Sequence, residues 1–136
     1  MLVRKRKFEP GEYDLVIKRA KAGLGLFTLN PIKKGACIIE YVGREISEEE
    51  KISSRGRYLF EINSKKTIDG STKTNKARYI NHSCLPNCEA EIWRGGAFIM
   101  AKKNIKAGEE LNYDYDKEYF DAYIKKHSCR CIKCHK

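Results

Sequence analysis

The apolar residues of this chain fall into short runs, which limits its possible folds more than any other feature. Glycine, proline and charged residues end each run after a few positions, a length typical of strands and too short for most helices. The runs rich in strand-forming residues are 15–17, 37–46, 58–62, 67–69, 89–93 and 97–102. The turn sequence Arg94-Gly95-Gly96 separates the last two and predicts a β-hairpin. We therefore expect a mainly β domain with little helix.

Four local signals refine this expectation. Gly43 interrupts the longest run and marks a bulge or a point of close backbone approach. The sequence Ile-Lys-Lys-Gly at 32–35 is echoed by Ile-Lys-Ala-Gly at 105–108, which indicates a reused turn before a strand. A Ser-x-x-Glu capping box at 47–50 is expected to open a short helix that stops at Gly56. Aromatic residues in 117–126 are compatible with a second short, amphipathic helix.

Length and hydropathy narrow the class of protein. The chain has 136 residues, of which 41% are hydrophobic, and this fits one compact domain rather than a disordered segment. No apolar run approaches the ~18 residues that a membrane-spanning helix needs. The charged start of the chain has no apolar stretch behind it, so it does not read as a secretory signal. We expect an intracellular protein without a membrane partner.

The net charge of +10 is concentrated toward the two ends of the sequence. Residues 1–22 and 117–136 carry most of the basic excess, whereas the central part is close to balanced. This distribution indicates a general attraction to acidic partners rather than a surface that reads nucleic-acid sequence. The alternative is that both ends are simply solvated termini.

Three of the six cysteines lie within six residues, at Cys129, Cys131 and Cys134. In a reducing compartment such a cluster does not indicate disulfides, and thiolates packed this closely suit a tetrahedral zinc ion. The alternative is a set of incidental or redox-active thiols. A closed zinc site needs a fourth ligand, and spacing does not choose among the remaining candidates. These are Cys84, Cys88, Cys37, His127 and His135.

Two segments have the character of a functional site. Residues 78–88 are polar, contain a proline and lie between apolar strands, as an ordered functional loop does. A nucleophilic pair of His82 and Cys84 is a weak alternative, because residues two apart seldom align as base and nucleophile. Tyr113 and Tyr115 alternate along a predicted strand and should share a face, whether as site residues or as an ordinary aromatic pair.

Together these segments resemble the SET domain family of protein lysine methyltransferases. The matching segments are 22–27, 40–45, 58–60, 68–70, 78–88 and 108–115, and the terminal cysteines resemble a post-SET segment. The resemblance implies a β-clip-like SET fold of short strands and small sheets. Residues 81–82 and the strand of Tyr115 would thread into its pseudoknot-like core. It also implies a basic N-terminal extension at 1–13, a SET domain at 14–116 and a post-SET zinc-binding segment at 117–136.

The resemblance further implies transfer of a methyl group from S-adenosylmethionine to a protein lysine. Tyr115 would be the central active-site tyrosine, with Tyr58 and Tyr113 lining the lysine channel. The implied cofactor-binding residues are Gly23, Leu24, Arg78, Asn81, His82 and Tyr115. The implied ligands of one structural zinc ion are Cys84, Cys129, Cys131 and Cys134, which leaves Cys88 as a buried thiol.

Two features depart from the family pattern. The last two cysteines, Cys131 and Cys134, are separated by two residues, whereas the family usually separates them by four. The chain also lacks a cysteine-rich pre-SET segment and has a minimal stretch before Tyr58. Because both regions help to hold the peptide in relatives, substrate selection should rest on few contacts.

The expected substrate is a histone, another DNA-packaging protein or another basic protein, with nucleic acid bound only non-specifically. A tyrosine at position 113, two before the central tyrosine, is the restrictive choice in the family and favours mono- to dimethylation. The alternative function is an inactive SET-fold binding module for chromatin, nucleic acid or acidic partners. The joint presence of Asn81, His82, Tyr113 and Tyr115 favours the enzyme. It would act in the nucleus on chromatin in a eukaryote or as a secreted effector, and in the cytoplasm of a prokaryote.

Overall fold

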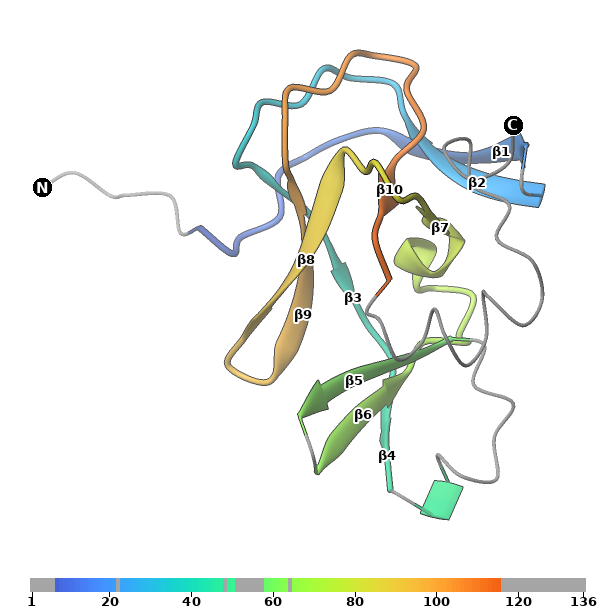
Figure 1. The fold of residues 1–136 in the computed structure, drawn as a ribbon, viewed down its shortest axis with the longest axis vertical. Coiled ribbons are helices and arrows are strands. Elements are labelled where there is room, and N and C mark those ends of the chain that lie inside the picture. Colours follow the sequence, from blue (N-terminus) through green and yellow to red (C-terminus); the bar gives the residue numbers. More distant parts are fainter. Residues whose placement is uncertain (1–6, 22, 48, 51–57, 64, 116–136) are drawn as a thin grey trace, which may run out of the picture.

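A computed structural model describes residues 7–21, 23–47, 49–50, 58–63 and 65–115 of the chain. These residues form short strands, one 3₁₀ helix and a helical turn at 49–50, which confirms a mainly β fold (Figure 1). The elements are β1 Leu15–Ala20, β2 Gly23–Thr28, β3 Cys37–Tyr41, β4 Arg44–Ile46, β5 Leu59–Asn63, β6 Lys66–Asp69, η1 Lys76–Tyr79, β7 Asn81–His82, β8 Cys88–Trp93, β9 Gly96–Ala101 and β10 Asn112–Tyr113. Within the described residues, no helix has the length and apolar character needed to cross a bilayer.

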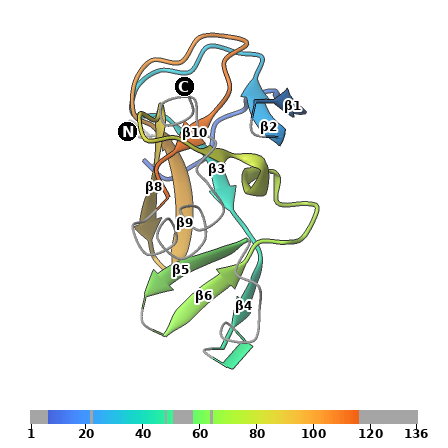
Figure 2. The ribbon, with the colours of Figure 1, turned by 45° about the vertical axis from the view of Figure 1, so that its right-hand side comes forward.

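The strands are divided among three small sheets. β1 and β2 form an antiparallel hairpin, and β4, β6 and β5 form a three-stranded antiparallel sheet in that order. The central sheet has the order β3-β9-β8-β10-β7. Figure 2 shows the three-stranded sheet at one end of the molecule and the β1–β2 hairpin near the other. The central sheet lies between them and contributes more residues to the larger hydrophobic cluster than either of the other sheets.

The predicted hairpin between residues 89 and 102 is confirmed. β8 and β9 pair antiparallel from Cys88 opposite Ala101 to Trp93 opposite Gly96. The two turn residues, Arg94 and Gly95, both have positive φ, 47° and 76°. Two consecutive positive φ angles are the requirement of a type I′ turn, whose twist matches that of the flanking strands.

Gly43 is a point of close backbone approach, as the sequence predicted. The run 37–46 breaks into β3 and β4 at Val42 and Gly43, and the two strands join different sheets. A side chain at Gly43 would collide with the backbone carbonyl of Asp69 on β6. The buried amide of Asn75 stabilises the break, because its Oδ1 accepts a hydrogen bond from Val42 N at 3.1 Å.

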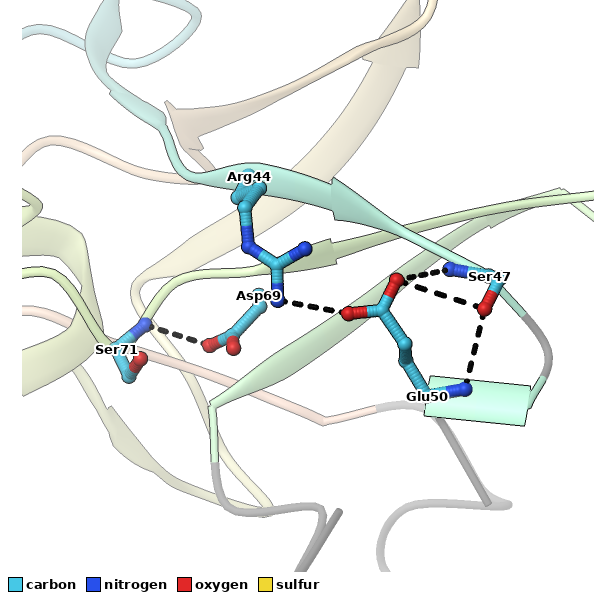
Figure 3. A network of polar contacts seen from close by, with 5 residues as sticks. All are labelled: Arg44, Ser47, Glu50, Asp69 and Ser71. Carbon is cyan, nitrogen blue, oxygen red and sulfur yellow. Dashed lines mark hydrogen bonds and ion pairs between the residues drawn. The ribbon is translucent and has the colours of Figure 1, made fainter. Parts of the chain in front are cut away.

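The capping box is also confirmed where the structure describes it. Glu50 N donates to Ser47 Oγ at 3.2 Å, and Ser47 N donates back to Glu50 Oε1 at 3.3 Å (Figure 3). Arg44 on β4 adds an exposed ion pair with Glu50 at 2.9 Å. The expected helix end at Gly56 and the expected helix at 117–126 lie outside the described residues.

The interior contains two adjacent clusters. The larger one joins the central sheet to β2, β6 and η1, and Leu26, Ile99 and Leu111 in it are fully buried. The smaller one consists of Cys37, Phe98 and Met100, with Phe8 and Trp93 packed against it. Phe8 stacks on Trp93 with a centroid separation of 5.1 Å, so the segment around Phe8 covers this cluster.

Candidate functional site

The candidate site forms where β10 lies between β7 and β8. Asn112 and Tyr113 of β10 pair parallel to Asn81 and His82 of β7, and Tyr113 also pairs with Cys88 of β8. The loop 83–87 joins β7 to β8 and therefore passes across β10. This threading is the arrangement expected of the SET core, and it brings the polar loop of 78–88 beside the two tyrosines.

Strands of two residues need additional support, and Asn87 supplies it. Its side chain is 7% exposed and forms two hydrogen bonds to the segment of β10. Nδ2 donates to Glu110 O at 2.8 Å, and Oδ1 accepts from Asn112 N at 3.0 Å. Asn112 Oδ1 in turn accepts from Asn87 N at 2.9 Å. This reciprocal pair fixes β10 beside the start of β8, where Tyr113 pairs with Cys88.

The two tyrosines lie side by side, as their alternation predicted. The rings of Tyr113 and Tyr115 have centroids 4.8 Å apart and are tilted by 56°. Tyr113 is buried and Tyr115 is partly buried. The Tyr115 hydroxyl donates to Ile80 O at 2.6 Å, which ties the end of the β10 segment to the residue before β7.

His82 contacts both the tyrosine segment and Cys84. Its Nδ1 accepts a hydrogen bond from Tyr115 N at 3.2 Å and lies 3.6 Å from Asp114 Oδ1. Because Nδ1 is the acceptor, we assign the ring proton to Nε2, which lies 3.2 Å from Cys84 Sγ. Burial lowers the pKa of His82, and the nearby carboxylate of Asp114 opposes this shift. The imidazole is therefore neutral near pH 7.

The three described cysteines differ in their access to solvent. Cys37 and Cys88 are buried, and burial raises the pKa of Cys88 to about 12, so both are poorly placed to bind metal as thiolates. Cys84 is exposed and lies beside the imidazole of His82. Of the three, Cys84 is the one that fits a zinc ligand, whereas Cys129, Cys131 and Cys134 lie outside the described residues.

The glycine segment of β2 reaches the site through Asn81. Asn81 Nδ2 donates to Leu24 O at 3.0 Å and to Glu110 Oε2 at 2.8 Å. A side chain at Gly25 would collide with the same Glu110 carboxylate. Gly23 has a φ of 112° and open space beside it, so the backbone here is accessible to a ligand.

Arg78 is the first residue of the polar loop 78–88, and it contacts Tyr58. Its guanidinium carbon is 4.8 Å from the ring centroids of both Tyr58 and Tyr79. Nη2 donates to the Tyr79 hydroxyl at 3.0 Å, and Nη1 donates to the carbonyl of Ser71. Nε is buried and has no hydrogen-bond partner in the described structure. The contacts thus associate Arg78 with Tyr58, and Asn81 with Leu24.

The sequence did not single out three polar residues that build this region. Asn75 is fully buried and joins the β3–β4 break to Gly70, Asn87 holds β10, and Glu110 faces Asn81. Asn75 gives no local signal in the sequence. Asn87 and Glu110 lie inside the two segments predicted to be functional, and their polar side chains beside apolar strands were the available signal.

Comparison with known proteins identifies the class. The family profile described as SET domain matches residues 23–116, and the chain therefore belongs to the SET domain family. It is 40% identical over 125 residues to Histone-lysine N-methyltransferase 2D of Homo sapiens, a match that covers 83% of this chain and 2% of the human protein. It is 39% identical over 131 residues to Histone-lysine N-methyltransferase trr of Drosophila melanogaster, covering 87% of this chain and 5% of that protein.

A plant relative matches over almost the whole chain. The identity to Histone-lysine N-methyltransferase ASHH1 of Arabidopsis thaliana is 35% over 146 residues, which covers 95% of this chain and 29% of the plant protein. The chain thus spans a small part of the length of each of these relatives.

Proposed function

We propose that this chain is an S-adenosylmethionine-dependent protein-lysine N-methyltransferase that acts on a histone or a similar basic protein. The observation that supports it most is the pairing of β7 with β10, which joins Asn81 and His82 to Tyr113 and Tyr115. The relatives named histone-lysine methyltransferases support the substrate class. By the same comparison we propose chromatin as the place of action.

The residues around Asn81 fit a polar, positively charged ligand such as S-adenosylmethionine. Both hydrogen bonds of Asn81 use its amide nitrogen, which leaves Oδ1 to accept a bond from a ligand amine. The Glu110 carboxylate supplies negative charge beside it, and the buried Nε of Arg78 is a donor without a partner in the described structure. We therefore assign Gly23, Leu24, Arg78, Asn81, His82 and Tyr115 to cofactor binding and add Glu110.

Bound S-adenosylmethionine would supply an electrophilic methyl group on a sulfonium. The residues of the chain must present a neutral amine, although a free lysine has a pKa of about 10.4 and its deprotonation at pH 7 costs about 4.6 kcal/mol. A channel walled by the rings of Tyr58 and Tyr113 would lower this pKa by excluding water. The Tyr115 proton is held by Ile80 O, so its oxygen lone pairs can accept a hydrogen bond from the amine and orient the nitrogen.

Tyr113 supports a proposal for the product. Its ring contacts that of Tyr115, so its hydroxyl can hold a water molecule or the amine in a narrow space. This group must move before a methylated nitrogen can realign for another transfer. We propose monomethyllysine as the main product, with some dimethyllysine.

We also propose that Cys84 and the three cysteines of residues 117–136 hold one structural zinc ion. The exposure of Cys84 and the burial of Cys37 and Cys88 support this ligand choice. Four thiolates would fix the C-terminal segment next to the candidate cofactor site. The division into an extension at 1–13, a SET domain at 14–116 and a post-SET segment at 117–136 belongs to the same proposal.

The test is incubation of the chain with isotopically labelled S-adenosylmethionine and a panel of histones and other basic proteins, followed by mass spectrometry of the modified lysine. The matched variant is Tyr115→Phe. Loss of one hydroxyl at a reacting centre lowers the rate by about 10²–10³. The enzymatic function is supported if the parent transfers methyl groups and the variant loses this activity to the stated extent while it still binds the cofactor. Cofactor binding without transfer to any protein would favour the inactive binding module.

A further inference from the structure

Two turns that are distant in sequence lie against each other at one end of the molecule. These are the echoed segments around 32–35 and 105–108, and Figures 1 and 2 show both at the end opposite the β4-β6-β5 sheet. Ile32 N donates to Ile105 O at 2.9 Å, and Ile105 N donates to Ile32 O at 2.8 Å. Gly35 and Gly108 have nearly equal φ angles of 89° and 91°. The sequence echo thus corresponds to two similar turns that pair with each other.

This pairing gathers exposed lysines into one surface. Residues 31–36 and 102–109 contain five lysines and one acidic residue, Glu109. Both isoleucines are 2% exposed and hold the two backbones together from inside. The five lysines, which we call the lysine edge, are Lys33, Lys34, Lys102, Lys103 and Lys106, and all are exposed.

The charges of the lysine edge are not neutralised within the described part of the protein. None of its five ammonium groups has an ion pair with a described residue. The Glu109 carboxylate accepts a hydrogen bond from the backbone N–H of Lys106 instead. Lys34 N donates a hydrogen bond to Asn104 Oδ1 of the other turn at 2.9 Å. This bond fixes the backbone of Lys33 and Lys34 relative to that of Lys102 and Lys103. The edge is therefore a preorganised cationic surface.

We propose that the lysine edge is a docking surface for the phosphate backbone of duplex DNA. Lysine ammonium groups bind phosphates as point charges. The two segments contain no aromatic residue, so they offer no stacking platform for single strands. They also lack the tryptophan, tyrosine and arginine side chains in which protein hot spots are enriched, which favours a phosphate backbone over a protein partner. The surface fits a regular line of phosphates without sequence preference.

The test is the fluorescence anisotropy of a labelled short DNA duplex of mixed sequence, titrated with the 136-residue chain over about 50 to 200 mM salt. The variants are Lys33→Gln with Lys34→Gln, and Lys102→Gln with Lys103→Gln. The matched control is Lys65→Gln with Lys73→Gln, which removes the same charge from exposed positions outside the edge. All proteins are first compared by thermal unfolding.

Each edge pair should reduce the slope of log Kobs against log salt by about 1.8, because each phosphate contact contributes about 0.9. The control should retain the slope of the parent. Equal weakening by the control would show that binding follows net charge alone and would overturn the proposal. DNA binding that is unchanged in both double variants of the lysine edge would also overturn the proposal. So would binding of polyglutamate to the lysine edge that is as strong as the binding of DNA.

The proposal does not depend on methyl transfer. Transfer to a free histone is measured on the same variants, and it should match the parent because the lysine edge contains no residue of the candidate site. A failure of DNA docking and a failure of the proposed enzymatic activity are thus separate results.

Discussion

Replacement of Asn87 tests whether one buried amide holds the candidate site together. Asn87→Ala removes two hydrogen bonds, from Nδ2 to Glu110 O and from Asn112 N to Oδ1. The peptide groups of Glu110 and Asn112 lose these partners at a site that solvent hardly reaches, because Asn87 itself is only 7% exposed. A buried polar group left without a partner costs about 1–3 kcal/mol, so two such groups predict a loss of roughly 2–6 kcal/mol in the free energy of unfolding.

Urea unfolding followed through the single tryptophan, Trp93, measures this loss. The matched control is Asn63→Ala, which removes one side-chain-to-backbone bond of the same type, from Lys65 N to Asn63 Oδ1 at 2.8 Å. Asn63 is exposed, so water can replace its bond, and the control should lose less than about 1 kcal/mol.

A second variant separates hydrogen bonding from volume. Asn87→Asp keeps the size of the side chain and the oxygen that accepts from Asn112 N, but it points a carboxylate at the carbonyl of Glu110. We expect it to be at least as destabilising as the alanine variant. If Asn87→Ala costs no more than Asn63→Ala, the two-residue strand β10 is held by something other than this amide, and the reasoning fails.

Three further predictions concern the zinc, the product and the N-terminal segment. Metal analysis should give about one zinc per chain and none in Cys131→Ser. This variant should bind the cofactor more weakly but retain the β core. Parent protein that is purified without chelator and contains no zinc would contradict the ligand set. Tyr113→Phe should shift the product toward di- and trimethyllysine at a similar first-transfer rate, and a parent that readily trimethylates would contradict the role of Tyr113. Phe8→Ala should lower the free energy of unfolding by about 1–2 kcal/mol, because a half-buried ring stacked on Trp93 and packed on Phe98 is lost; an unchanged urea midpoint would show that this contact contributes nothing.

Local sequence signals predicted the local features of this fold. The hairpin turn at Arg94-Gly95 and the capping box at Ser47 depend on residues close together in the chain, whereas Gly43 indicated a close approach without identifying its partner, Asp69. The shared face of Tyr113 and Tyr115 follows from alternation alone. These predictions required no knowledge of the tertiary structure.

The assembly of the candidate site could not be predicted in the same way. β7 and β10 contain two residues each, which is too short for any hydrophobic periodicity. β10 is also held beside β8 by the reciprocal bonds of Asn87 and Asn112, which are 25 positions apart. The resemblance to the SET family supplied this arrangement, whereas the residue pattern gave only its two separate segments.

Two other features could not be predicted from the linear order of the residues. Spacing argued against His82 and Cys84 as a base and nucleophile, and it gave no indication that Nε2 and Sγ lie 3.2 Å apart. The count of charges along the sequence placed the basic excess at the ends. The paired turns nevertheless collect a lysine edge from the nearly balanced central part.

Side chains of the candidate site also hold the fold, because several of them bind backbone carbonyls on other elements. The Tyr115 hydroxyl binds Ile80 O, and Asn81 binds Leu24 O. Removal of either side chain therefore changes the geometry of the site as well as its chemistry, and an alanine variant cannot separate the two effects. Tyr115→Phe keeps the ring contacts with Tyr113 and His82 and removes one hydrogen bond, whose net contribution to stability is about 0.5–1.5 kcal/mol. A rate loss of about 10²–10³ corresponds to roughly 2.7–4 kcal/mol, which exceeds that contribution and would have to come from the hydroxyl acting on the reacting groups.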